Sequence, residues 1–142
     1  MGTLPYPENG SVSRRVQAVC DWFGSTELLT MPPNNIGKGR TEEDVANSNG
    51  AKLLGCTVKD CPELERQASA YDDVYTDDAP FLIMHGGEDQ GLPIQKSIQF
   101  YERLRKTGVP VQFEVMEGAG HGESFLIRRK LRQQYELFSI NI

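Results

Sequence analysis

The chain has 142 residues, of which 38% are hydrophobic and 25% are charged, a size and composition typical of one globular domain. Its formal net charge of -5 at pH 7 argues against a nucleic-acid-binding surface, because phosphate contacts require clustered Lys and Arg in excess of the acids. No apolar run approaches the roughly 20 residues that a membrane span requires, so we expect no integral membrane segment in this sequence.

The first half of the chain contains one clear strand and a long polar segment. Residues 1–13 hold Pro and Gly without a period, which predicts a linker or lead-in. Residues 15–23 are β-branched and aromatic, which predicts a strand. We expect a long loop or cap-like insertion over residues 25–62 that covers a site, with Thr41 capping a short helix within residues 41–54.

The second half alternates helices and strands. We expect a helix over 63–70, a strand over 80–85, a helix over 94–107, a strand over 111–116 and a closing helix over 123–140. Such an alternation, with right-handed crossovers, predicts an α/β fold with a parallel sheet and flanking helices. Residues 14–142 would form this single domain.

An acid and a histidine each follow one of these strands in a glycine-rich turn. Asp89 lies in HGGEDQGLP (residues 85–93), and His121 lies in GAGHG (residues 118–122). Loops that follow consecutive parallel strands open at the same edge of the sheet, so we expect Asp89 and His121 to lie close together. A carboxylate that accepts a hydrogen bond from imidazole Nδ1 leaves Nε2 ready to take a proton from a nucleophile. The alternative is that Asp89 caps the helix near Pro93 and that His121 is an ordinary loop histidine.

The nucleophile is the missing part of this arrangement. No Gly-x-Ser-x-Gly, and no equivalent turn around Cys or Thr, occurs in the sequence. Ser25 and Ser124 are weaker candidates, and Ser124 is better suited to capping a helix. Asp89 and His121 are therefore interpreted as two thirds of a hydrolase triad. The competing function is a non-catalytic interaction module that retained both loops.

The motifs HGxxDxxLP (residues 85–93) and GxGHG (residues 118–122), separated by a helix, resemble the C-terminal part of the α/β-hydrolase superfamily. The segments VQAVCDWFGSTELL and LLGCTVKDCPELERQAS are similar to the corresponding parts of feruloyl- and acetyl-esterase-like carboxylesterases. The resemblance covers about residues 14–138. It implies an α/β-hydrolase fold whose N-terminal strands are missing from this chain, and a serine carboxylic ester hydrolase that needs no cofactor or metal.

Carried over by position, the resemblance makes Asp89 the triad acid and His121 the general base, with the serine before residue 1. Prolyl-oligopeptidase-type peptidases share nearly the same two motifs, so a peptidase remains an alternative. His85, Gly86 and Gly87 resemble an oxyanion turn, but they end the strand before the acid, so we interpret them as part of the acid motif and His85 as structural.

Four apolar residues are predicted to bind the acyl or aryl part of a small-molecule ester, because they follow the first strand towards the same sheet edge: Trp22, Phe23, Leu28 and Leu29. Leu28 and Leu29 could instead form a core under the long loop. The absence of strands flanking residues 15–23 predicts an edge that pairs with the N-terminal half of the same enzyme or with a second copy.

The cysteines constrain the compartment. Cys56 and Cys61 could form a local disulfide, which would imply a secreted or periplasmic protein, whereas reduced thiols would fit the cytoplasm. A metal site is the alternative, but two cysteines without nearby histidines are too few ligands. Cys20 lies in the first predicted strand and is interpreted as a small core residue.

Overall fold

The computed structural model describes residues 15–28, 43 and 46–122. Several expectations lie outside these residues: the lead-in over 1–13, the helix over 123–140, Leu29, the cap Thr41 and Ser124. Within the described part of the chain, no helix combines the length and the apolar character that crossing a membrane requires.

A parallel three-stranded sheet organises the described residues, as the sequence predicted. Its strands are β1 (Val19–Trp22), β2 (Phe81–Gly86) and β3 (Val111–Met116), in the order β1-β2-β3. The register pairs Phe81 with Val19 on one side and with Val111 on the other. The central strand β2 is buried from Leu82 to Gly86, because both of its edges are paired and α4 packs on one of its faces.

Strand β1 is shorter than the expected strand over residues 15–23. Pairing begins at Val19, because its partner Phe81 is the first residue of β2. The strand ends at Trp22, because Phe23 adopts a positive φ of 44°, outside the extended region. The β-branched and aromatic residues therefore extend beyond the four residues that pair with β2, and the sequence predicted a strand that is too long.

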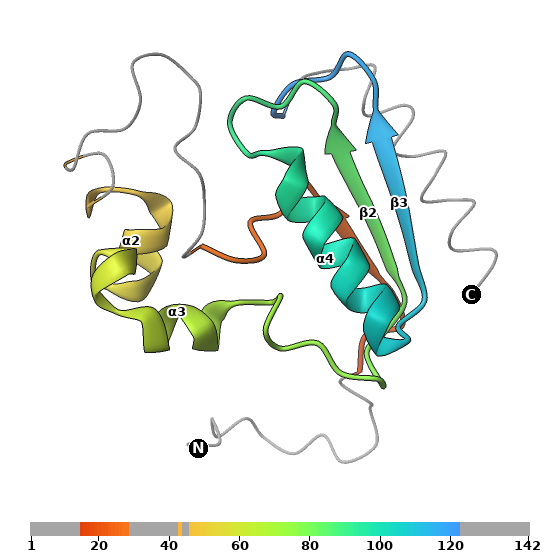
Figure 1. The fold of residues 1–142 in the computed structure, drawn as a ribbon, viewed down its shortest axis with the longest axis horizontal. Coiled ribbons are helices and arrows are strands. Elements are labelled where there is room, and N and C mark those ends of the chain that lie inside the picture. The colour runs from red at the N-terminus through yellow and green to blue at the C-terminus, as the bar shows by residue number, and fades with distance from the viewer. Residues whose placement is uncertain (1–14, 29–42, 44–45, 123–142) are drawn as a thin grey trace.

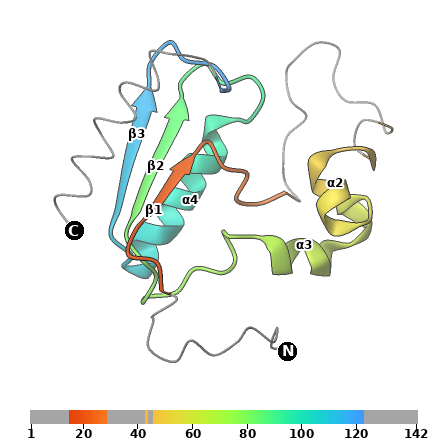
Figure 2. The same ribbon diagram turned by 180° about the vertical axis from the view of Figure 1, so that it is seen from behind.

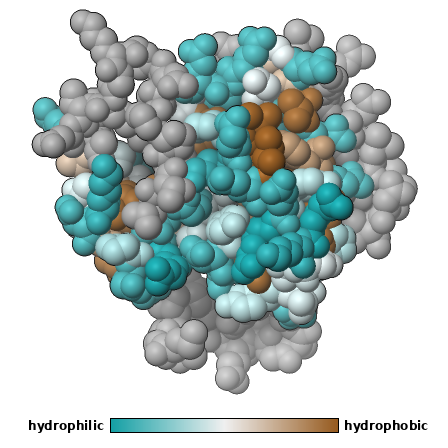
Figure 3. Space-filling view, viewed as in Figure 1, coloured by the Kyte–Doolittle hydropathy of each residue, from teal (hydrophilic) through white to brown (hydrophobic). Residues whose placement is uncertain are grey.

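Helix α4 (Ile94–Thr107) packs against one face of the sheet, where it contacts β2 and β3, and lies on the viewer's side of the sheet in Figure 1. In the opposite view the strands lie in front of this helix (Figure 2). The core on the helix side consists of five buried residues, namely Val74, Ile83, Phe100, Leu104 and Val109. The outer surface over α4 is mostly hydrophilic, with only small hydrophobic areas (Figure 3).

The ends of α4 follow the sequence prediction for 94–107 to the residue. Pro93 precedes the first turn, and Gly108 ends the helix with a φ of 92°. The amides of Gly108 and Val109 donate to the carbonyls of Arg105 and Leu104 at 3.1 and 3.0 Å. No side chain caps the N-terminus of α4, so the alternative in which Asp89 caps this helix is wrong.

The expected insertion over residues 25–62 carries helices of its own. These are helix α2 (Asn49–Leu54) and the 3-10 helix η1 (Val58–Asp60). The helix expected over 63–70 follows as α3 (Pro62–Ala68), and all three lie to one side of the sheet in Figures 1 and 2. Ser48 Oγ accepts a hydrogen bond from Ala51 N at 3.1 Å and so caps α2. Cys56 and Cys61 form a disulfide between α2 and α3, with their Cα atoms 6.4 Å apart.

Candidate active site

The loops that follow β2 and β3 are joined by backbone hydrogen bonds at one edge of the sheet. Gly87 N donates to Met116 O and Glu88 N donates to Ala119 O, each at 2.9 Å. A Cβ atom at Gly86 would lie 2.8 Å from the carbonyl oxygen of Gly120, so only glycine allows the two loops to approach this closely. The loop of the acid and the loop of the histidine are thereby held together, as Figure 1 shows above the two strands.

Asp89 and His121 form a direct hydrogen bond. His121 Nδ1 lies 2.8 Å from Asp89 Oδ2, although the residues are 32 positions apart in the sequence. The side chain of Asp89 is fully buried, whereas that of His121 is 51% exposed. The structure therefore brings the two sequence-predicted residues together, with the acid inside and the base facing solvent.

The other oxygen of Asp89 is held by its own loop. Oδ1 accepts hydrogen bonds from Gly91 N and Leu92 N, each at 2.8 Å. Burial alone would raise the pKa of Asp89, but the hydrogen bonds from Leu92, His121 and Gly91 outweigh it and hold the pKa below its ordinary value. Asp89 is thus a charged acceptor at neutral pH that fixes the hydrogen of His121 on Nδ1.

The second nitrogen of His121 is available for chemistry. Among the described residues, none forms a hydrogen bond with His121 Nε2. With its hydrogen on Nδ1, the neutral ring has a lone pair on Nε2, and this atom of a half-exposed side chain can accept a proton and return it. The geometry suits general base and general acid catalysis of acyl transfer.

Gly91 contributes to the same geometry, although the sequence motif did not single it out. A Cβ atom at position 91 would lie 3.2 Å from His121 Cβ and 3.1 Å from His121 Cγ. Any larger residue would press on the imidazole, so glycine leaves the space that the ring occupies. The glycine-rich turn around His121 was visible in the sequence, but this contact between two loops was not.

The apolar residues after β1 have different surroundings. The ring of Phe23 packs against His121 at a centroid distance of 5.2 Å and lies 6.3 Å from the ring of His85. Trp22 is 49% exposed, and its indole N–H donates to Cys20 Sγ. Leu28 lies beside α2, because a Cβ atom at Gly50 would be 3.2 Å from its Cδ1 atom. Of the residues predicted to bind substrate, Phe23 therefore contacts the histidine and Leu28 packs elsewhere.

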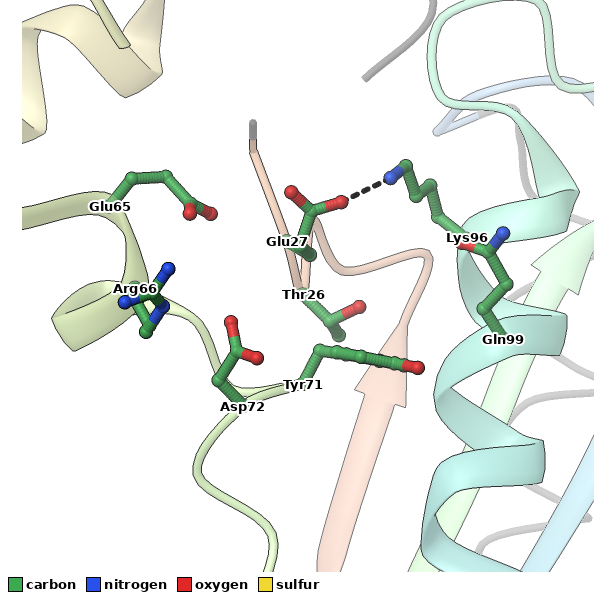
Figure 4. A pocket seen from close by; sticks show the side chains of 8 residues that line it. All are labelled: Thr26, Glu27, Glu65, Arg66, Tyr71, Asp72, Lys96 and Gln99. Carbon is green, nitrogen blue, oxygen red and sulfur yellow. Dashed lines mark hydrogen bonds and ion pairs between the residues drawn. The ribbon is translucent and has the colours of Figure 1, made fainter. Parts of the chain in front are cut away.

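A separate pocket of about 370 Å³ lies between α3 and α4 (Figure 4). Its lining is polar and carries both signs of charge, including an ion pair between Lys96 and Glu27. It includes neither Asp89 nor His121, and it is not the apolar ester pocket predicted from the sequence. Its lining residues are Thr26, Glu27, Glu65, Arg66, Tyr71, Asp72, Lys96 and Gln99.

The described residues contain neither a group of side chains that could hold a metal ion nor a serine in the turn typical of a nucleophile. In residues 15–28, 43 and 46–122, no group of three or more His, Cys, Asp or Glu side chains is arranged to hold a metal. Ser25 is exposed and follows β1 in an irregular segment, without the strand-to-helix elbow that presents a nucleophilic serine.

Comparison with protein families supports the resemblance noted in the motifs. A family model named BD-FAE matches residues 4–104, which is more than half of the chain. The chain belongs to the BD-FAE family. The solved esterases that resemble this BD-FAE family chain have the α/β-hydrolase fold, so the expected fold is confirmed.

Individual relatives of this BD-FAE family chain are longer proteins. Esterase LipC of Mycobacterium tuberculosis (strain ATCC 25618 / H37Rv) is 37% identical over 71 residues, covering 49% of this chain and 18% of LipC. The uncharacterized peptidase YtmA of Bacillus subtilis (strain 168) is 34% identical over 61 residues, covering 43% of this chain and 24% of YtmA.

A solved structure extends the comparison to most of the chain. The bifunctional GH43-CE of Bacteroides eggerthii matches with a TM-score of 0.69 and 27% identity, covering 91% of this chain and 17% of that chain. The chain thus spans less than a quarter of each of these three proteins.

Proposed function

We propose that this BD-FAE family chain supplies the acid and the histidine of the Ser-His-Asp triad of a carboxylic ester hydrolase. The observation that carries the proposal is the 2.8 Å hydrogen bond from His121 to a buried, charged Asp89, made by a His121 side chain that is half exposed. The similarity to an esterase and to solved esterase structures supports this class of reaction.

The reaction follows from the atoms of the pair. His121 Nε2 takes the proton of a serine hydroxyl as its oxygen attacks the ester carbonyl carbon, and Asp89 stabilises the resulting imidazolium. His121 then returns the proton to the departing alcohol oxygen, which leaves an acyl-enzyme. A water molecule, deprotonated by the same Nε2 atom, releases the acid and restores the serine.

The proposal assigns the serine and the oxyanion donors to a segment that precedes this chain in the same protein. The great length of the relatives and the absence of a Gly-x-Ser-x-Gly turn in the 142 residues support this assignment. Strand β1 lies at the edge of the described sheet, so the preceding segment would pair there. Phe23, which packs on His121, and the exposed Trp22 would face the ester.

Hydrolysis of p-nitrophenyl acetate tests the proposal in two proteins, the chain alone and the chain joined to the segment encoded directly upstream. We expect turnover only in the joined protein. His121→Ala and Asp89→Asn should each lower kcat by roughly 10³- to 10⁴-fold with little change in KM, because they remove the base or its correct tautomer.

Asp60→Asn is the matched control, since it makes the same change at an exposed acid in η1 and should retain full activity. A folded joined protein that is inactive would refute the proposal and favour an interaction module. Turnover that survives His121→Ala would refute the assignment of His121 as the base.

A peptidase is the second candidate function, favoured by the 34% identity to the peptidase YtmA. The same histidine and acid would serve amide hydrolysis, in which Nε2 protonates a departing amine instead of an alcohol. Amino-acyl p-nitroanilides, assayed beside the ester at equal concentration, separate the two: a higher kcat/KM on the anilide would assign the chain to a peptidase.

A further inference from the structure

His85 is a buried histidine that the proposed reaction leaves without a role. Its side chain lies at the end of strand β2 and is fully buried, so it cannot contact a substrate. Its Nε2 atom lies 2.9 Å from the carbonyl oxygen of Leu92. A carbonyl oxygen only accepts hydrogen bonds, so Nε2 must carry the hydrogen.

The other nitrogen of His85 is satisfied by Ser97 on α4. Nδ1 lies 2.7 Å from Ser97 Oγ, and both side chains are completely buried. In a neutral ring with its hydrogen on Nε2, Nδ1 accepts, so the Ser97 hydroxyl donates. Both ring nitrogens therefore have partners, and the orientation and the tautomer of His85 are fixed from two sides.

His85 acts on Asp89 by two routes. Its hydrogen-bearing Nε2 atom lies 3.3 Å from Asp89 Oδ2, the same oxygen that contacts His121. It also holds Leu92 through the carbonyl, and the amide of Leu92 donates to Asp89 Oδ1. The carboxylate is thus held at Oδ1 through Leu92, and the Nε2–H group of His85 lies beside Oδ2, which favours the orientation that faces His121.

We infer that His85 is a positioning residue for Asp89, and that Ser97 sets the tautomer in which His85 performs this role. The inference rests on the proposed function, because a restrained Asp89 matters only if His121 must carry its hydrogen on Nδ1. Without a fixed acceptor at Nδ1, the neutral imidazole of His121 can carry the hydrogen on Nε2, and this tautomer cannot act as the base.

Nitrogen NMR of the ¹⁵N-labelled chain tests this directly, because the sequence contains only two histidines, His85 and His121. Two-bond ¹H–¹⁵N correlations report which ring nitrogen carries the hydrogen, and they need no serine and no turnover. We expect hydrogen on Nε2 for His85 and on Nδ1 for neutral His121.

Substitutions separate positioning from space filling. His85→Met removes the N–H group and should convert neutral His121 from mainly Nδ1–H to mainly Nε2–H. His85→Gln keeps an N–H donor on a side chain of similar length and should retain the Nδ1–H form. A purely structural role would make the two variants equivalent.

Ser97→Ala should shift His121 in the same direction as His85→Met but by less, because Nε2–H of His85 remains. Ser69→Ala is the matched control, since Ser69 is equally buried but bonds the carbonyl of Thr26 instead of a histidine. It should leave both tautomers unchanged, with folding of every variant checked by far-UV circular dichroism.

Three results would overturn the inference: a wild-type His85 with hydrogen on Nδ1 alone, a His85 that is doubly protonated between pH 6 and 8, or an unchanged His121 in folded Ser97→Ala. The Ser97→Ala result decides the matter even if His85→Met does not fold. Each of these failures would leave the result of the ester hydrolysis assay unchanged, so a failure of this inference is distinguishable from a failure of the proposed function.

Discussion

Two buried aspartates near the ends of neighbouring strands have opposite electrostatic environments. Asp89 accepts two backbone amides and an imidazole, and its pKa is lowered. Asp21 in β1 accepts only the amide of Gly24, its Oδ2 atom is buried without a hydrogen-bond partner, and burial raises its pKa. Burial is the largest cause of the raised pKa of Asp21, which one amide donor offsets only in part, whereas three hydrogen bonds outweigh the burial of Asp89.

These shifts predict opposite pH dependences of stability. The ordinary aspartate pKa is 3.8, and the folded-state pKa of Asp89 lies below it, so the stabilisation is present above 3.8 and lost as the pH falls through the folded value. Asp89→Asn should therefore lower the free energy of unfolding at pH 7, and the deficit should disappear only in strong acid.

The sign reverses for Asp21, because a raised folded-state pKa means that the charged form destabilises the fold above that value. Asp21→Asn should increase the free energy of unfolding at pH 7, and the gain should shrink as the pH falls towards 3.8. Urea unfolding at pH 7, 5 and 3 measures both variants. A destabilising Asp21→Asn at pH 7 would contradict this account.

The space beside His121 predicts a sharp difference between two glycines of the same loop. Gly91→Ala would place its methyl group 3.2 Å from His121 Cβ, whereas Gly87→Ala would meet its nearest atom at an ordinary 3.5 Å. The imidazole would have to move by a few tenths of an ångström, and this shift should lower kcat of the joined protein on p-nitrophenyl acetate by roughly 10-fold or less. Gly87→Ala should stay near wild type, and equal losses in both variants would argue against a specific contact.

At the scale of the element, prolines and glycines at the ends of helices and strands determined how accurately the sequence predicted their bounds. Helix α4 and strand β3 match their predicted ranges, because Pro93, Gly108 and Pro110 mark their ends. Strand β1 was predicted too long, since its extent depends on where Phe81 begins the partner strand. No propensity signals the turn at Phe23, an aromatic residue with a positive φ that is held by tertiary contacts.

Only those parts of the candidate site that follow from the strand topology could be predicted from the sequence. The meeting of Asp89 and His121 follows from consecutive parallel strands, so their motifs sufficed. The bond of His85 to Ser97 depends on the rotation of α4 about its axis. That rotation is set by packing against the sheet, and the spacing of the motif residues does not predict it.

The packing of α4 makes its own prediction. Leu104 is fully buried against β2 and β3, whereas Ile98 on the same helix is 36% exposed. Leu104→Ala should lower the free energy of unfolding by about 2–5 kcal/mol, because it leaves a cavity in the core. Ile98→Ala serves as the control and should cost about 1 kcal/mol or less. Urea titrations that rank the two in reverse order would overturn the assigned helix face.

At the scale of the whole molecule, the described residues divide into a sheet with α4 and a lateral group of short helices. Helix α2 has 6 residues and α3 has 7, which is too short for either to be stable without tertiary support. The disulfide between Cys56 and Cys61 closes this group, and Glu65 links it to the chain after β1 by accepting Leu28 N at 2.9 Å.

Reduction should therefore loosen one part of the molecule and spare the other. In hydrogen–deuterium exchange, reductant or the Cys56→Ser and Cys61→Ser double variant should increase exchange in residues 49–68. Exchange in residues 81–116 should stay unchanged, because β2, β3 and α4 pack on one another, whereas the disulfide lies between α2 and α3. Uniformly faster exchange across both regions would mean that the chain unfolds as a single cooperative unit.

The unequal exposure of the two histidines allows His121 to be modified selectively. An acylating reagent selective for imidazole has one accessible target, since His85 is fully buried and His121 is 51% exposed. The Nδ1 atom of that target is engaged by Asp89, so modification falls on the outward-facing nitrogen. We expect one acyl group per molecule, attached at the atom that transfers the proton. The rate of acylation would then report the reactivity of that nitrogen.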